Sequence, residues 1–147
     1  VEGDSMLPNF SDGEYLIVDE ISYRFKEPSR GDVIVFHPPT NGGIFLIKRI
    51  IGLPGETVKI ENGRIVVDAN ENKIILNEEY LPEGIKTFPD ISLKLSSGEY
   101  FVLGDNRDRS SDSRLWGVLE KDGITGRAFL RLWPLNKIGI LNTGYSF

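Results

Sequence analysis

Residues 58–67 read Val-Lys-Ile-Glu-Asn-Gly-Arg-Ile-Val-Val, and this stretch carries the strongest local structural signal in the chain. Apolar and polar residues alternate before Asn62-Gly63, as in a strand with one buried face. A type I′ turn requires positive φ at both central residues, and Asn-Gly is the pair that tolerates this best. The segment therefore predicts an antiparallel β-hairpin.

Similar short runs of β-branched and aromatic residues lie on both sides of the hairpin. They are bounded by glycine, proline, asparagine and aspartate, which favour turns. The sequence shows no long helical periodicity and no repeat. We therefore expect a mainly β, antiparallel fold, with strands over residues 15–18, 33–36, 44–51, 57–61, 64–68, 73–76, 100–103 and 128–133.

The length of 147 residues suits one domain with its own core. The middle of the chain, about 59–97, is more polar than the segments that flank it. The apolar strands before and after this region resemble parts of one core. We therefore expect a single domain over 1–147 with a smaller, polar β-hairpin region inserted at about 59–97.

Composition excludes several classes of function. A net charge of −5 argues against a nucleic-acid partner. The absence of cysteine excludes thiol catalysis and zinc–cysteine sites, and a single histidine, His37, excludes the two-histidine zinc motifs. We expect neither a metal nor a cofactor. No apolar run approaches the ~18 to 20 residues that cross a bilayer.

Lys48 interrupts the apolar run over residues 44–51. On a strand it shares a face with aliphatic neighbours, whereas Arg49 points the other way. An aliphatic environment removes water from an amine and lowers its pKa, which would make it a competent general base. The alternative is an edge-strand lysine whose amine reaches water. Taken alone, the strand favours this alternative.

Ser5 lies in Gly3-Asp4-Ser5-Met6-Leu7-Pro8, a sequence suited to a tight, exposed turn. It matches neither the G-x-S-x-G elbow nor the S-x-x-K pattern of other serine enzymes. A Ser-His-Asp triad would need His37, which comes at the end of a strand and is expected to be a bystander. By itself, Ser5 is one turn serine among several.

The segment from Gly104 to Gly117 reads Gly-Asp-Asn-Arg-Asp-Arg-Ser-Ser-Asp-Ser-Arg-Leu-Trp-Gly. Charges of alternating sign and three serines lie here between an apolar strand and Trp-Gly. Such a cluster is usually a solvated loop. It could instead form a buried network of ion pairs that braces a site, at the cost of desolvation.

Taken together, these segments resemble the bacterial type I signal peptidases. The matching motifs occur in the order found in that family and cover the chain from Val1 to about Leu135. The last motif matches the family pattern G-D-N-R-x-x-S-x-D-S-R at every specified position. The four segments are Gly3–Pro8, Gly31–Phe36, Ile47–Glu56 and Gly104–Arg114.

The resemblance implies a Ser-Lys dyad in a signal-peptidase-like β-sheet catalytic core, so the chain would be a catalytic domain fragment. Ser5 would be the nucleophile, Lys48 the general base, and Ser110 the hydroxyl that orients the lysine amine. The Ser5 backbone N–H would be one oxyanion donor. Some members carry a second donor serine where this chain has Gly3. A structural network would consist of Arg49, Asp105, Asp112 and Arg114.

The implied substrates are the signal peptides of exported preproteins, cleaved after small residues in an Ala-x-Ala pattern. An extended substrate would add as a strand beside residues 44–48. By position, two shallow pockets would be lined by Val1, Met6, Phe10, Leu16, Val35, Leu46 and Ile47. The alternative for each of these residues is ordinary core packing.

Family members carry a membrane anchor upstream of the nucleophile motif, and this chain begins only a few residues before Ser5. We expect a monomeric catalytic fragment without that anchor. It would act at the extracytoplasmic face of the bacterial cytoplasmic membrane. Contact with the lipid surface would use exposed apolar residues such as Met6 and Leu7, because the negative net charge gives no attraction to anionic lipid.

Two other functions stay open. A self-cleaving stress-response repressor shares the Ser-Lys dyad, but it would carry a cleavable Ala-Gly bond before the serine and would lack the 104–114 segment. No Ala-Gly occurs in this sequence. An inactive β domain that binds extended peptides is the other candidate. Acylation of Ser5 by a serine-directed inhibitor would distinguish an enzyme from such a binding domain.

Overall fold

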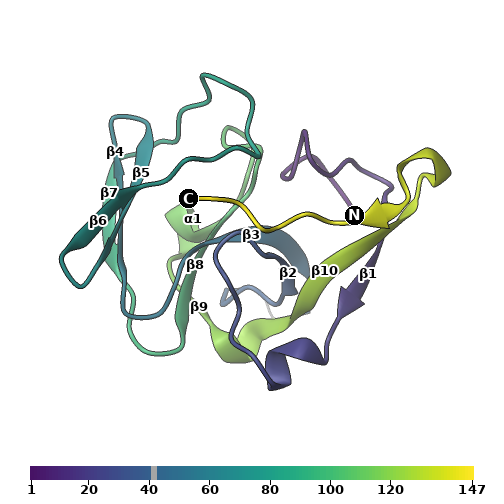
Figure 1. The fold of residues 1–147 in the computed structure, drawn as a ribbon, viewed down its shortest axis with the longest axis horizontal. Coiled ribbons are helices and arrows are strands. Elements are labelled where there is room, and N and C mark those ends of the chain that lie inside the picture. The colour runs from purple at the N-terminus through teal and green to yellow at the C-terminus, as the bar shows by residue number, and fades with distance from the viewer. Residues whose placement is uncertain (41–42) are drawn as a thin grey trace.

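Two antiparallel sheets form the computed structural model, which describes residues 1–40 and 43–147 (Figure 1). Within these residues the larger sheet has seven strands, in the order β1-β10-β2-β3-β8-β9 with β11 on β10. Its strands are β1 (Tyr15–Asp19), β2 (Val33–Phe36), β3 (Leu46–Gly52), β8 (Glu99–Leu103), β9 (Leu119–Glu120), β10 (Ile124–Trp133) and β11 (Gly139–Ile140). The mainly β, antiparallel fold expected from the sequence is confirmed.

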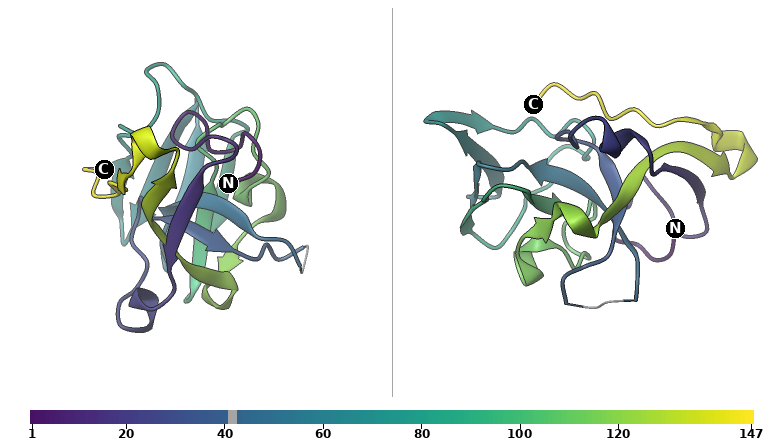
Figure 2. Two further views of the ribbon diagram at one scale, coloured as in Figure 1. Left: turned by 90° about the vertical axis from the view of Figure 1, so that its right-hand side faces the viewer. Right: turned by 90° about the horizontal axis from the view of Figure 1, so that it is seen from below.

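The smaller sheet follows β3 in the chain and ends before β8. Its described strands pair in the order β6-β5-β4-β7, and Figures 1 and 2 show them at the opposite end of the molecule from β1. Asn62 and Gly63 have φ of 52° and 80°, so the predicted hairpin turn is confirmed. The strands are β4 (Thr57–Glu61), β5 (Arg64–Ala69), β6 (Asn72–Ile75) and β7 (Ile91–Lys94).

Helical structure is limited to single turns within the described residues. The α-helix α1 (Ser113–Trp116) begins after Asp112, whose side chain accepts a hydrogen bond from the Arg114 backbone N–H. Three 3₁₀ turns are η1 (Ser22–Arg24), η2 (Lys121–Gly123) and η3 (Leu135–Lys137). In the ranges that the structure covers, no helix is long and apolar enough to cross a membrane.

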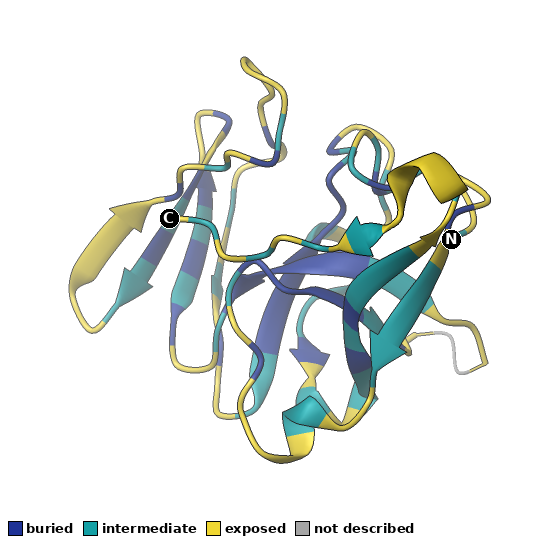
Figure 3. Ribbon diagram, turned by 45° about the vertical axis from the view of Figure 1, so that its right-hand side comes forward, coloured by how far each residue is buried: buried dark blue, intermediate teal, exposed yellow. Residues whose placement is uncertain are grey.

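Strand β3 joins the two halves of the core because its successive side chains enter different clusters. Ile50 packs with Ile34 and Phe36, whereas Ile51 packs against the smaller sheet. At Gly52, an added Cβ would lie 2.4 Å from Val58 Cγ2. Only glycine therefore lets β3 and β4 approach this closely. Figure 3 shows the buried residues concentrated along these central strands.

The chain leaves β11 as an extended segment that we call the C-terminal strap (residues 141–147). The strap runs from β11 back towards the smaller sheet (Figures 1 and 2). Its Tyr145 and Phe147 contact Tyr80, with ring centroids 5.1 and 6.2 Å apart. A Cβ on Gly31 would lie 2.9 Å from the Thr143 carbonyl oxygen. The strap thus lies directly over the chain that enters β2.

Candidate active site

Ser5 lies in a turn that is attached to the 104–114 loop. The backbone N–H of Asn106 donates to the Ser5 carbonyl oxygen at 2.9 Å, and the Asn106 side chain donates to the Asp4 carbonyl at 3.0 Å. Gly3 has a φ of +83°, a conformation that glycine adopts without strain. The Ser5 N–H has no hydrogen-bond acceptor among the residues described, so it is available to a ligand.

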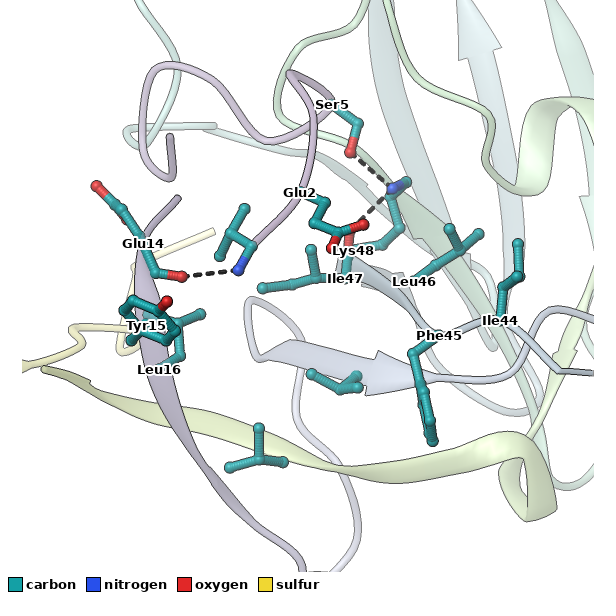
Figure 4. A pocket seen from close by; sticks show the side chains of 13 residues that line it. Glu2, Ser5, Glu14, Tyr15, Leu16, Ile44, Phe45, Leu46, Ile47 and Lys48 are labelled. Atoms are coloured by element: carbon teal, nitrogen blue, oxygen red, sulfur yellow. Dashed lines mark hydrogen bonds between the residues drawn. The ribbon is translucent and has the colours of Figure 1, made fainter. Parts of the chain in front are cut away.

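The amine of Lys48 meets this serine. Lys48 Nζ lies 2.8 Å from Ser5 Oγ and donates to the Ile47 carbonyl oxygen at 2.9 Å (Figure 4). The Lys48 side chain comes from β3, which is hydrogen-bonded to β2 at this level. Two motifs 43 residues apart in sequence are thereby brought into direct contact.

Burial gives this lysine an unusual acidity. Lys48 is only 2% exposed, and both of its hydrogen-bond partners are uncharged oxygens. Loss of water lowers the pKa of Lys48 from 10.5 to about 8, although the carboxylates of Asp112 and Asp105 act in the opposite direction. Half of the amine is therefore neutral at about pH 8, so the form that a general base requires becomes available only slightly above neutral pH.

Arg49 points to the other face of β3 and pairs with Asp105. It donates to Asp105 through Nε at 2.9 Å and through Nη2 at 2.7 Å, and to the Gly31 carbonyl through Nη1. Its guanidinium lies 4.0 Å from the Tyr80 ring centroid. Asn9, which sequence reasoning did not place in this network, donates to Asp105 at 2.8 Å. Through Asn9, the Ser5 turn is thus linked to the same Asp105 carboxylate that pairs with Arg49.

A second buried ion pair lies behind the site. Asp112 accepts hydrogen bonds from the Gly104 backbone N–H at 3.0 Å and from the Arg114 guanidinium at 2.9 and 2.8 Å. Arg114 also donates to the Arg107 carbonyl. The four charged residues predicted as a structural network thus form two separate pairs, Arg49–Asp105 and Asp112–Arg114.

A third pair was not predicted. Arg107 is 4% exposed, and it donates to Glu78 at 2.9 Å and to Thr87 Oγ1 at 2.6 Å. Both partners come from the long connection after β6. The charged segment that contains Arg107 indicated a possible buried network, and this pattern could have identified Arg107 as buried. Nothing near Arg107 in the sequence identified Glu78 and Thr87 as its partners.

Ser110 is partly buried, and its Oγ is buried without a hydrogen-bond partner within the described part of the chain. The structure brings it to the site through Gly104. A Cβ added to Gly104 would lie 2.1 Å from Ser110 Oγ and 2.5 Å from the Ser5 carbonyl oxygen. Glycine at 104 therefore lets these two serines pack on either side of one backbone position. A hydrogen bond from Ser110 to the Lys48 amine is not formed here.

An apolar groove of about 560 Å³ begins at the Ser5–Lys48 pair and runs between β1 and the segment that leads into β3 (Figure 4). Five of the seven predicted pocket residues line it: Val1, Leu16, Val35, Leu46 and Ile47. The other lining residues are Glu2, Ser5, Glu14, Tyr15, Val18, Ile44, Phe45 and Lys48.

Met6 and Phe10 do not line the groove, which corrects the sequence-based expectation. They are 1% and 3% exposed and pack with Val33 and Ala128 in the core. The reason is local, because the Phe10 N–H donates to the Met6 carbonyl and this turn directs both side chains inward. The suggestion that Met6 contacts lipid is wrong for the same reason, since the side chain is hidden from the surface.

The edge of β3 is open beside the serine. β2 pairs with Leu46–Arg49, but β8 pairs with β3 only from Arg49 onwards. Leu46, Ile47 and Lys48 therefore have a strand on one side only, within the residues described. Their free edge carries backbone groups that an extended chain in the groove can pair with.

The single histidine is not hydrogen-bonded to Ser5 or Lys48. His37 is exposed, and its Nδ1 lies 3.0 Å from the Ile44 carbonyl oxygen. No group of three or more His, Cys, Asp or Glu residues suited to a metal ion occurs in 1–40 and 43–147. The hydrolytic chemistry available here is that of a serine hydroxyl and a weakly basic amine.

A serine paired with a buried lysine, beside an open strand edge and an apolar groove, is the arrangement of a serine peptidase that acts on extended chains. The family model described as "Signal peptidase, peptidase S26" matches residues 1–133. The chain belongs to this family of signal peptidases.

Individual relatives agree with this assignment. A signal peptidase I from Leptolyngbya laminosa is 40% identical over 157 residues, which covers 100% of this chain and 73% of that protein. A signal peptidase IB from Staphylococcus aureus is 34% identical, over 93% of this chain and 78% of the relative. The crystal structure of a signal peptidase I from Enterococcus faecalis aligns with a TM-score of 0.59 and 34% identity, over 69% of this chain and 97% of that one.

Proposed function

We propose that this chain is the catalytic domain of a serine endopeptidase that removes signal peptides from exported preproteins, with Ser5 as nucleophile and Lys48 as general base. The observation that carries the proposal is the 2.8 Å contact between Ser5 Oγ and the buried Lys48 amine. Membership of the signal peptidase family supplies the class of substrate. One catalytic domain then covers 1–147, with the smaller sheet as an insertion at about 59–97.

The chemistry requires the neutral form of Lys48. The amine takes the proton of Ser5 as Oγ attacks the scissile carbonyl carbon. The proton then passes to the departing amine, the peptide bond breaks, and an ester to Ser5 remains. Water deprotonated by the same amine hydrolyses the ester and regenerates Ser5. The free N–H of Ser5 is one donor to the oxyanion.

Ser110 has a positioning role in this mechanism. Within the described residues its buried hydroxyl has no hydrogen-bond partner, and a role in the reaction would explain why this costly arrangement is kept. When Ser5 becomes acylated, Lys48 loses its serine contact. Ser110 lies beside the Ser5 carbonyl across Gly104, and we propose that its Oγ then accepts a hydrogen bond from the lysine amine.

Specificity follows from the groove and the free strand edge. A signal peptide bound as a strand beside Leu46–Lys48 directs alternate side chains into the groove. In this proposal the aliphatic walls of the groove, which include Val35 and Ile47, exclude large side chains and so favour an Ala-x-Ala pattern.

Lipid contact is assigned to a surface other than Met6. Exposed apolar residues occur where β1 begins and β10 ends, and in the η3–β11 segment that follows β10. This end of the larger sheet lies close to the N-terminus and carries exposed segments (Figure 3). The exposed apolar residues are Tyr15, Trp133, Leu135, Ile138 and Ile140, each at least 48% exposed. We propose that this surface contacts the extracytoplasmic face of the cytoplasmic membrane and that the enzyme acts there as a monomer.

Mass spectrometry of a signal-peptide substrate containing Ala-x-Ala tests the proposal. The chain and its Ser5→Ala variant are each incubated with the substrate in lipid or detergent. Cleavage after the second alanine by the parent alone is expected. Cleavage by both, or by neither, overturns it. Because the neutral amine is the active form, the parent rate should rise as pH passes through about 8.

A further inference from the structure

Glu2 is an unused charge in the groove. Its side chain is exposed, lines the groove, and projects towards the end where Ser5 and Lys48 meet (Figure 4). Among the described residues it forms no side-chain hydrogen bond and no ion pair. Nothing in the fold requires a carboxylate at this position, since no contact that holds the Ser5 turn involves it.

The other charged groups that line the groove are already satisfied, and the α-amino group of Val1 donates to the Glu14 carbonyl oxygen at 2.7 Å. Glu14 is 3% exposed and its carboxylate contacts Arg131 at 3.0 Å and Lys137 at 3.7 Å. Lys48 is held by Ser5 and the Ile47 carbonyl. Every other lining side chain apart from Ser5 is aliphatic or aromatic. Glu2 is therefore the charge that an incoming peptide meets, and apolar walls strengthen its effect.

We propose that Glu2 is a specificity-determining residue that favours a cationic side chain at the middle position of the Ala-x-Ala segment. This inference rests on the proposed function. In an extended substrate, the two small side chains enter the groove and the side chain between them points the opposite way, towards the mouth. Glu2 lines the groove and is exposed to solvent, on the loop that carries Ser5. A lysine or arginine there gains an ion pair, whereas a glutamate is repelled.

The test uses three peptides that differ only in the middle residue, which is Lys, Gln or Glu. The measured quantity is the ratio of kcat/KM for the Lys peptide to that for the Glu peptide. For the parent we expect a ratio of about ten, because attraction is exchanged for repulsion at one partly screened site. The ratio should fall as salt is added.

Two variants of Glu2 and one control complete the design. Glu2→Gln should bring the ratio close to one, and Glu2→Lys should invert it, a reversal that a damaged fold cannot produce. Glu83→Gln makes the same change in net charge at an exposed position away from the groove and should keep the parent ratio. A parent ratio near one, or a ratio that survives in Glu2→Gln, overturns the proposal.

The Gln peptide separates this inference from the function on which it rests. If the parent does not cleave that peptide after its second alanine, the proposed function itself fails and the inference fails with it. If the peptide is cleaved but the Lys-to-Glu ratio does not depend on Glu2, the function stands and only the role of Glu2 is overturned.

Discussion

Lys48 and Arg49 are adjacent on β3 and equally hidden, at 2% and 1% exposed, but the two faces of the strand treat their charges in opposite ways. On the groove face, burial lowers the pKa of Lys48 to about 8. On the other face, burial alone would lower the pKa of Arg49, but the hydrogen-bonded Asp105 carboxylate outweighs it and raises that pKa. Partners, rather than depth, decide which cation stays charged.

The comparison extends beyond the two residues. Around the site, Arg49, Arg107 and Arg114 each pair with a carboxylate and each also donates to a backbone or hydroxyl oxygen. On the groove face, the hydrogen-bond acceptors of the Lys48 amine are neutral oxygens, and the Ser110 hydroxyl has no hydrogen-bond partner among the described residues. Saturated pairing gives rigidity, whereas incomplete pairing leaves the groups that must exchange protons free to do so.

The largest expected effect comes from replacing Lys48 by arginine, so that both faces of β3 carry a permanently charged side chain. Lys48→Arg replaces the neutral base by a guanidinium that does not deprotonate in proteins. Cleavage of an Ala-x-Ala peptide should fall at least about a thousandfold. Steady-state kinetics, with circular dichroism to verify folding, measures this. Substantial residual turnover would remove Lys48 from the role of base.

The second test removes the carboxylate that pairs with Arg49. Asp105→Ala leaves Arg49 buried without its carboxylate, and we expect a loss of about 3–5 kcal/mol in the free energy of unfolding. Urea denaturation measures the change. The double variant Arg49→Met/Asp105→Leu removes both charges and should recover most of the loss. Equal stability of the single variant and the parent would contradict the bracing role of this pair.

The third test measures how much the buried Lys48 amine lowers the free energy of unfolding. Below pH 8 the amine is protonated in both folded and unfolded states, so the folded state bears the whole penalty, up to about 3 kcal/mol. Between about 8 and 10.5 the folded state has lost the proton and the unfolded state retains it, so stability rises with pH. Lys48→Met should therefore be more stable than the parent at pH 7, with an advantage about halved by pH 9.5. An advantage independent of pH, read from urea midpoints, would argue against a lowered pKa.

The smallest expected effect comes from removing the Ser110 hydroxyl. Ser110→Ala should lower kcat about tenfold with little change in KM, because Ser110 positions the amine rather than the substrate. Ser110→Thr keeps the hydroxyl and serves as the conservative variant. A parent-like kcat in Ser110→Ala would make this serine a bystander.

The local features of the fold were accessible from sequence. The Asn62-Gly63 turn and the alternation along β3 depend on neighbouring residues only, so their patterns predicted hairpin and faces correctly. Local reasoning failed where a turn redirects side chains. Met6 and Phe10 were expected in a pocket on the basis of position, but the backbone hydrogen bond between them directs both into the core.

Long-range partners could not be predicted in the same way. Arg107 lies in a segment whose charges suggested a buried network, but its partner Glu78 lies 29 residues away in an unremarkable polar stretch. Tyr145 and Phe147 lie outside every motif and reach Tyr80 only through the path of the strap. The Ser5–Lys48 contact required knowledge of a family pattern, since each residue alone had an ordinary structural explanation.

The C-terminal strap has a consequence for the order in which the protein matures. The Arg49 guanidinium lies 5.4 Å from the centroid of the Tyr145 ring, and Tyr145 packs with Tyr80 on the same side of β3. A ribosome makes Lys48 and Arg49 well before residues 141–147. The cover that the strap contributes to the arginine face of the catalytic strand can therefore form only after residues 141–147 have emerged and docked.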